Sequence, residues 1–258
     1  MIKHTHDPLI FNAQVNKVKY SKTDENERQC PFCDKSQQNN ILKTEGDKVW
    51  LMNKFQTIEQ SFMTVLIESA KHDGDITTYD QRENRELFRF AMDCWKETMD
   101  SHKYKSVLMF KNFGPMSGGS LRHPHFQIIG LESVEGYDEI LPDNFKGPEA
   151  LSEPNLVVTL STSPIMGTVE INVITYDLTD TDAFADAVQK SAQYLMNDFH
   201  DGRCHSYNLF FYQFDRGFIC KLVPRFLTSP YFIGYKIPQV YTKPRLQEIV
   251  AELKGKLC

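Results

Sequence analysis

Runs of apolar residues separated by polar turns divide the first half of the chain into strands and one amphipathic helix. Three runs are typical of buried strands, at 62–68, 106–110 and 123–130. Between the first two, apolar residues recur at helical spacing over 78–101, which predicts a helix with one buried face. Thr78 followed by Gln81 fits a capping box at the start of that helix.

The second half of the chain repeats this order of elements. Strands are predicted at 156–161, 168–176, 207–214 and 218–223, and helices at 182–199 and 244–257. Asp215-Arg216-Gly217 is a tight turn signal between the last two strands. The repetition predicts an α+β fold made of a duplicated unit, with mostly antiparallel sheets and flanking helices. We expect a first half over 1–135, a linker over 136–155 rich in proline and acidic residues, and a second half over 156–258.

Composition and charge narrow the classes of function. The chain has 258 residues, of which 41% are hydrophobic, enough to form a core. Its net charge of −5, without a basic run, is unfavourable for general nucleic-acid binding. No apolar run is long enough to cross a bilayer, and the N-terminus has no signal-peptide pattern, so we expect a cytoplasmic protein without membrane contact. Its six cysteines are then expected to stay reduced.

The densest polar cluster lies in the strand predicted at 123–130. Because side chains alternate along a strand, His123, His125 and Gln127 are expected to share one face. Pro124, Phe126 and Ile128 are expected on the other face, which is apolar and suits a core. Pro124 cannot donate a ladder hydrogen bond, so the strand is expected at a sheet edge or irregular at its start. A solvated strand face with two incidental histidines is the structural alternative to a functional site.

A glycine-rich loop, 112–120, precedes this strand. Glycine lets the main chain approach a ligand closely and present N–H groups to an anion. Gly114, Gly118 and Gly119 are placed to do so, and Ser120 adds a hydroxyl group. An ordinary connection between strands would have a similar sequence, so the loop alone is weak evidence.

Cys30 and Cys33 form a Cys-x-x-Cys pair, which occurs in zinc sites and in redox pairs. A closed zinc site needs four cysteine or histidine ligands. One candidate set adds His72 and His123 to the cysteines. A rival set adds both His123 and His125, and spacing alone does not choose between them.

Several blocks together resemble the histidine-triad superfamily, specifically its galactose-1-phosphate uridylyltransferase branch. The matching residues are Cys30-Pro31-Phe32-Cys33, Asn53-Lys54-Phe55, His72 and the stretch from Asn112 through Gly118-Gly119-Ser120 to His123-Pro124-His125-Phe126-Gln127. The match in order and spacing extends over about residues 7–130. The second half matches in outline and in patches such as Ser206-Tyr207-Asn208.

The resemblance implies a nucleotidyltransferase that acts on a nucleotide sugar or another nucleotide conjugate. It gives His125 the role of nucleophile at the α-phosphorus and Gln127 that of a phosphate contact. It places Asn112 and Ser120 on the phosphate and nucleotide side, with Asn53, Gly118 and Gly119 as further substrate-binding candidates. It also implies a structural zinc on Cys30, Cys33, His72 and His123, which favours the first ligand set. Such proteins usually form dimers, so a homodimer is left open.

Departures from the family pattern leave the acceptor open. The bulky Phe126 follows the nucleophile, and Arg122 before the motif is either an extra phosphate clamp or a solvated charge. Two alternatives therefore stand beside transfer to a phosphorylated acceptor. One is a hydrolase or phosphorylase of dinucleoside polyphosphates or nucleotide conjugates, and the other is a nucleotide-binding relative without turnover.

Overall fold

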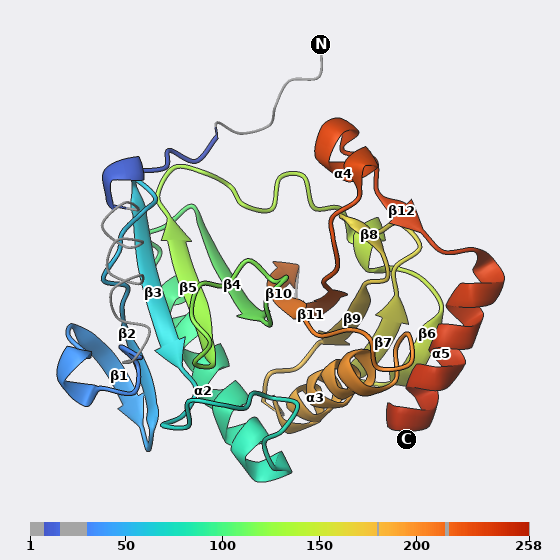
Figure 1. Ribbon diagram of the computed structural model, residues 1–258, viewed down its shortest axis with the longest axis horizontal. Coiled ribbons are helices and arrows are strands. Elements are labelled where there is room, and N and C mark those ends of the chain that lie inside the picture. The colour runs from blue at the N-terminus through green and yellow to red at the C-terminus, as the bar shows by residue number, and fades with distance from the viewer. Residues whose placement is uncertain (1–7, 16–29, 180, 215–216, 258) are drawn as a thin grey trace. The chain divides into compact units, whose positions relative to one another are not determined.

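Short apolar runs form the central strands of this protein, several of them buried along almost their whole length. Figure 1 shows these strands and the helices. The computed structural model describes residues 8–15, 30–179, 181–214 and 217–257. These residues form two units of mixed α and β structure. Unit 1 contains the described residues up to Gly74 with Phe90–Phe110 and Leu121–Glu139. Unit 2 contains Asp75–Arg89, Lys111–Ser120 and the described residues from Ile140 onward.

Unit 1 contains a sheet in the order β1-β2-β3-β5-β4. Its strands are β1 (Ile41–Glu45), β2 (Lys48–Met52), β3 (Ser61–Ile67), β4 (Ser106–Phe113) and β5 (His125–Leu131), with β4 continuing into unit 2 from Lys111. The pairs β1/β2, β2/β3 and β3/β5 are antiparallel. A 3₁₀ helix, η1 (Lys35–Gln37), precedes β1. Part of α2 (Gln81–Asp100), from Phe90 onward, also belongs to this unit, and Trp95 Nε1 donates to the Val107 carbonyl at 3.0 Å.

The main strands of unit 2 follow the order β10-β11-β9-β7-β6, and all neighbours in this order are antiparallel. They are β6 (Glu149–Glu153), β7 (Leu156–Leu160), β9 (Ile171–Thr175), β10 (Tyr207–Phe214) and β11 (Gly217–Pro224). The helices α3 (Thr181–Asn197) and α5 (Lys243–Leu257) pack on the sheet and on each other. The remaining elements are η2 (Pro142–Phe145), α4 (Pro230–Tyr235) and a small parallel pair, β8 (Gly167–Thr168) with β12 (Gln239–Val240).

The mixed α+β class with antiparallel sheets and flanking helices is confirmed. Burial follows the predicted helical face of α3, where Phe184, Val188 and Leu195 are fully buried. β10 has the predicted bounds, and its Phe214 pairs with Gly217 of β11. Asp215 and Arg216 of the predicted turn lie outside the described residues.

The start of α2 differs from the prediction. Asp80 is the residue that caps the helix, because its Oδ1 accepts from the Glu83 N–H at 2.8 Å. Thr78 instead bonds within the preceding turn, where its hydroxyl donates to the Asp75 carbonyl at 3.0 Å. The capping box of Thr78 and Gln81 is therefore wrong, and the helix begins three residues later.

Two further predictions are corrected by the pairing of strands. The expected linker contains η2 and β6, and β6 pairs with β7, so this segment includes a strand of the sheet. The single strand predicted at 168–176 is divided into β8 and β9. Glu170 lies between them and accepts main-chain N–H groups from Ile165, Met166 and Gly167, which turns the chain.

Glu170 also forms a buried ion pair in unit 2. Lys221 Nζ donates to Glu170 Oε2 at 2.7 Å, to Ser161 Oγ at 2.9 Å and to the Asn144 carbonyl at 2.9 Å. Both side chains are almost completely buried, and burial lowers the pKa of Lys221. Burying two charges is costly, but here each is fully surrounded by hydrogen-bond partners.

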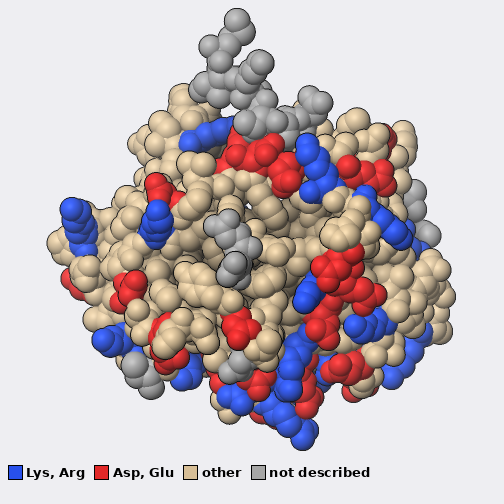
Figure 2. All heavy atoms as spheres, turned by 180° about the vertical axis from the view of Figure 1, so that it is seen from behind, with Lys and Arg blue, Asp and Glu red and all other residues tan. Residues whose placement is uncertain are grey.

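Acidic and basic side chains are intermingled on one face of the molecule. On the face drawn in Figure 2, lysine and arginine side chains lie among aspartates and glutamates instead of gathering in a basic patch. None of the helices in the described ranges combines the length and apolar character needed to span a lipid bilayer.

We predict that Glu170→Ala destabilises the protein by about 3–5 kcal/mol, because it leaves a buried lysine without its counter-charge. Lys146→Ala removes an exposed ion pair with Asp143 and is the matched control, with an expected cost under about 1 kcal/mol. Urea denaturation of both variants measures the difference. Equal midpoints for the two variants would contradict this account of the buried pair.

Candidate functional site

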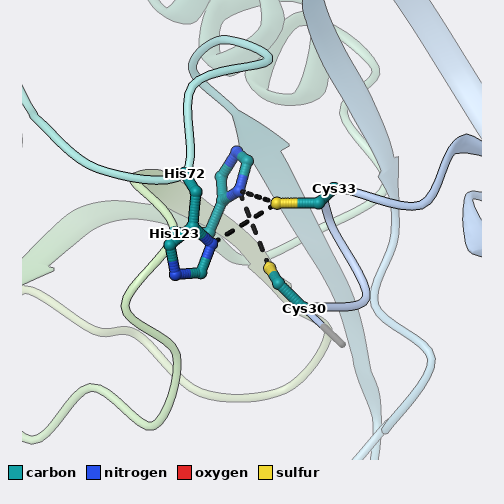
Figure 3. Close-up of side chains that lie close together, drawn as sticks. All are labelled: Cys30, Cys33, His72 and His123. Atoms are coloured by element: carbon teal, nitrogen blue, oxygen red, sulfur yellow. Dashed lines mark hydrogen bonds between the residues drawn. The ribbon is translucent and has the colours of Figure 1, made fainter. Parts of the chain in front are cut away.

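Four side chains from three separate segments of unit 1 converge on one point (Figure 3). They are Cys30, Cys33, His72 and His123. Their ligand atoms all lie within 4.8 Å of one another. His123 Nδ1 is 3.7 Å from Cys30 Sγ and 3.4 Å from Cys33 Sγ, and His72 Nδ1 is 3.4 Å from Cys33 Sγ.

The local chain explains this convergence. The two cysteines share a tight turn in which the Cys33 N–H donates to the Cys30 carbonyl at 3.1 Å. His72 lies in the turn after β3, and His123 lies two residues before the start of β5, the strand that pairs with β3. Adjacent strands of one sheet therefore bring both histidines to the same end of the sheet.

The donors of this cluster fit a tetrahedral zinc ion. Two thiolates and two imidazole nitrogens are a common structural zinc set. His123 Nε2 donates to the Ser69 carbonyl at 2.9 Å, which leaves Nδ1 unprotonated and facing the cysteines. The pKa of Cys33 is raised by burial and by the neighbouring Cys30, and a bound cation would oppose that shift.

The rival ligand set, with His125 in place of His72, is not the one assembled. Within the described residues, the only group of three or more potential ligands contains His72. His125 Nδ1 instead donates to the main-chain carbonyl of His123 at 2.8 Å. The His123 ring thus belongs to the cluster with the cysteines, whereas the His125 ring bonds to the main chain.

His125 is held in one tautomer by this hydrogen bond. A carbonyl oxygen only accepts, so Nδ1 carries the proton and Nε2 is the unprotonated nitrogen. The Phe32 ring contacts the imidazole edge-on, with centroids 5.3 Å apart. His125 is the first residue of β5 and is 7% exposed.

β5 lies inside its sheet, between β3 and β4. Of the two possibilities raised by Pro124, an edge strand is therefore wrong and an irregular start is confirmed. Pro124 precedes the first strand residue and supplies only its carbonyl, which accepts from the Glu68 N–H at 3.2 Å. Phe126 and Ile128 are fully buried, as expected for the apolar face.

Gln127 and Asn53 lie on the same face of the sheet as His125. Gln127 is two residues along β5, opposite Val65, and is half-buried. The Asn53 N–H donates to the Met63 carbonyl, which sets Asn53 in register with this face, and Asn53 Oδ1 accepts from the Phe55 N–H. The same face carries an apolar cluster, against which Phe32 packs: Val49, Leu51, Val65 and Ile67.

The remaining loop candidates, Asn112, Gly118, Gly119 and Ser120, belong to unit 2. Gly118 to Ser120 are exposed, whereas Asn112 is half-buried. Ser117 fastens the loop because its hydroxyl donates to the Gly114 carbonyl at 2.7 Å. Asn208 Nδ2 donates to Asn112 Oδ1 at 2.6 Å and to the Ser117 carbonyl at 3.0 Å.

Arg122 lies on the surface of unit 1. Its guanidinium group pairs with Asp73 at 3.1 Å, and both side chains are largely exposed. Such an exposed pair contributes little to stability.

Sequence reasoning missed the groups that hold the candidate residues in place. Ser69 and Asn208 form their hydrogen bonds across separations of 54 and 91–96 residues, which no local pattern encodes. The one available signal was the patch Ser206-Tyr207-Asn208, where the second half matches the family outline.

Comparison with solved structures defines the class of fold. A uridylyltransferase is 16% identical in sequence and has a TM-score of 0.68, over 90% of this chain and 92% of that one. ADP-glucose phosphorylase from Arabidopsis thaliana, solved with bound ADP-glucose, is 16% identical with a TM-score of 0.69, over 88% of each chain. The chain therefore has the same fold as these two proteins.

Family models identify the chain more closely. The models for the N-terminal and C-terminal domains of a domain of unknown function, DUF4931, match residues 11–134 and 137–257, so the chain belongs to the DUF4931 family. The crystal structure of a DUF4931 family protein from Bacillus cereus ATCC 10987 is 42% identical, with a TM-score of 0.76, over 84% of this chain and 98% of that one. A search of the curated proteins gave no match.

We predict that two glycines of the loop respond differently to alanine. Both have a positive φ, +82° at Gly114 and +84° at Gly118, so each substitution costs about 1–2 kcal/mol of backbone strain. At Gly114 the new Cβ would also lie 2.2 Å from the His205 carbonyl oxygen, whereas at Gly118 it would meet nothing within 4 Å. We expect this overlap to add a further 1–3 kcal/mol or so.

Urea denaturation of Gly114→Ala and Gly118→Ala measures that difference. Gly118→Ala is the matched control for backbone strain without overlap. Similar stability losses in the two variants would show that the loop does not lie against the start of β10 as described.

Proposed function

We propose that this protein is a nucleotidyltransferase that moves a nucleoside monophosphate from a nucleotide sugar to a phosphorylated acceptor through a covalent intermediate on His125. The observation that carries the proposal is the 2.8 Å hydrogen bond from His125 Nδ1 to the His123 carbonyl. It leaves Nε2 as the nucleophilic nitrogen, and a neutral imidazole is available near pH 7 because histidine titrates at about 6.5.

In the first step, the Nε2 lone pair attacks the α-phosphorus of the nucleotide sugar. An N–P bond forms, the bond from the α-phosphorus to the bridging oxygen breaks, and the sugar phosphate leaves with that electron pair. In the second step, a phosphate oxygen of the acceptor attacks the same phosphorus, and Nε2 recovers its lone pair. Covalent catalysis of this kind divides one difficult transfer between two anions into two easier steps.

The other candidate residues supply binding and charge stabilisation in this scheme. Gln127 is two residues from the nucleophile on the same face and is assigned to the phosphoryl oxygens. Asn53 and the apolar cluster with Phe32 lie on that face and suit the nucleoside. The loop residues Asn112, Gly118, Gly119 and Ser120 are assigned to the phosphates through N–H and O–H donors. Arg122 would bind a phosphate by exchanging its ion pair with Asp73 for one with the substrate.

Solved structures with this fold support the substrate class. One is a uridylyltransferase, and another, an ADP-glucose phosphorylase, has ADP-glucose bound. We assign catalysis to the first half, residues 1–135, and regard the second half, 156–258, as a degenerate copy without its own histidine motif. The acceptor decides between transferase, phosphorylase and hydrolase.

The same proposal includes a structural zinc ion held by Cys30, Cys33, His72 and His123. The ion would fasten the cysteine turn and the His72 turn to the residue two positions before the nucleophile. In that position it supplies rigidity and does not take part in the transfer.

Covalent labelling tests the nucleophile. The protein is incubated with UDP-glucose and ADP-glucose labelled at the α-phosphorus, and we expect an acid-labile adduct that His125→Gly does not form. His102→Asn is a matched control, because His102 is an exposed histidine at a positive φ that asparagine also adopts. It should label like the wild type.

The fate of the label identifies the acceptor. Release by hexose 1-phosphate supports the transferase, release by inorganic phosphate supports a phosphorylase, and spontaneous release supports a hydrolase. Undiminished labelling of His125→Gly would overturn the assignment of the nucleophile, and binding without any adduct would indicate a protein without turnover.

Metal analysis tests the zinc ion separately. We expect about one equivalent of zinc per chain, and a lower melting temperature after chelation, because metal binding contributes to folding. His72→Ala should lower the zinc content, whereas His102→Ala should not. Zinc content unchanged in His72→Ala but lost in His125→Ala would instead support the rival ligand set.

A further inference from the structure

One buried asparagine of the second half is hydrogen-bonded to the glycine-rich loop. Asn208, the second residue of β10, is 2% exposed. Its Nδ2 donates to two acceptors of the loop, Asn112 Oδ1 at 2.6 Å and the Ser117 carbonyl at 3.0 Å. All three residues belong to unit 2.

These two bonds fix the orientation of both carboxamide groups. A main-chain carbonyl only accepts, so the side of Asn208 that faces Ser117 must be its NH₂ group. The same NH₂ group faces Asn112, which must therefore present its oxygen to Asn208. The Asn112 carboxamide is then oriented with Nδ2 as its remaining polar end, a donor suited to an anion.

Neighbouring contacts hold the loop in the same way. Ser206 Oγ accepts from the Met116 N–H at 3.0 Å. Gly114 approaches the start of β10 so closely that any side chain there would overlap the His205 carbonyl. The segment 205–208 thus forms a support for one side of the loop.

We infer that Asn208 is a positioning residue for the transfer reaction, because it sets the Asn112 carboxamide with its NH₂ group toward the phosphates of the nucleotide conjugate. The inference rests on the proposed function, since it assumes that Asn112 binds those phosphates. Asn208 acts through Asn112 and does not itself contact the substrate. It gives the second half of the chain a part in catalysis that its missing histidine motif does not provide.

The chemistry of the side chain predicts how its variants behave. Asn208→Ala removes the donor and frees the Asn112 carboxamide to rotate, which should slow adduct formation by about 10- to 100-fold. Asn208→Asp keeps the volume but replaces the donor with a carboxylate. Asn112 would then turn its NH₂ group toward residue 208 and its oxygen toward the phosphates, so the loss should be larger than in Asn208→Ala.

A double-mutant cycle separates positioning from general support of the fold. Adduct formation is followed with α-labelled nucleotide sugar at saturating concentration in Asn208→Ala, Asn112→Ala and the double variant. If Asn208 acts through Asn112, the double variant should be slower than Asn112→Ala by less than about threefold. Effects that multiply would overturn the inference, as would wild-type rates in Asn208→Ala and Asn208→Asp.

Asn172→Ala is the matched control for stability. Asn172 is a fully buried asparagine of the same unit whose Nδ2 also donates to side chains, those of Thr159 and Ser161, both at 3.0 Å. We expect it to lower the melting temperature but not the rate of adduct formation. If Asn172→Ala slows adduct formation as much as Asn208→Ala does, both losses come from instability and the inference is overturned. If Asn208→Ala does not fold, the isosteric Asn208→Asp replaces it in the double-mutant cycle with Asn112→Ala.

The same experiment distinguishes two kinds of failure. A wild-type protein that forms no adduct contradicts the proposed function. A wild-type protein that labels at His125, with Asn208 variants that label equally fast, contradicts only the role of Asn208.

Discussion

The hydrogen bond from His125 Nδ1 to the His123 carbonyl links the two halves of the histidine motif. The His123 side chain contributes to the cluster of two cysteines and two histidines, and the His123 main-chain carbonyl accepts the hydrogen bond from the His125 ring. Because the His123 ring is itself bonded to the Ser69 carbonyl, the position of the accepting oxygen depends on β3, the cysteine turn and the His72 turn together. The cluster of Cys30, Cys33, His72 and His123 and the His125 imidazole are therefore held by one connected set of contacts.

Local chemistry made much of this assembly predictable. The strand period placed His125 and Gln127 on one face and Phe126 and Ile128 in the core, and the structure confirms the burial of the apolar pair. Helical periodicity also found α3 and its buried face. The predictions failed where neighbouring polar residues compete. Asp80 caps α2 in place of Thr78, and nothing in the sequence signals that Glu170 turns inward and divides a strand.

Long-range contacts account for the rest of what the sequence did not predict. The linker was predicted from proline and acidic residues, but β6 gains its order from pairing with β7. The ligand set was ambiguous because sequence distance does not show which imidazole faces a cysteine. In the fold, β3 and β5 are neighbours, so His72 and His123 meet at one end of the sheet. Asn208 illustrates the same limit, since only the fold brings it to Asn112.

The second half of the chain has a group of hydrogen-bonded polar side chains in its interior, which includes the buried ion pair of Lys221 and Glu170. There Thr159 of β7, Asn172 of β9 and Lys221 of β11 are buried together with Ser161 and Glu170, which lie next to the ends of β7 and β9. Lys221 Nζ has three acceptors and Asn172 Nδ2 donates to two side chains, and these bonds favour one arrangement of the strands. The same strands hold the start of β10 in place, because β10 pairs with β11 along its whole length. Asn208 can orient a carboxamide only if its own main chain does not move, so the interior network and the loop support depend on the same sheet.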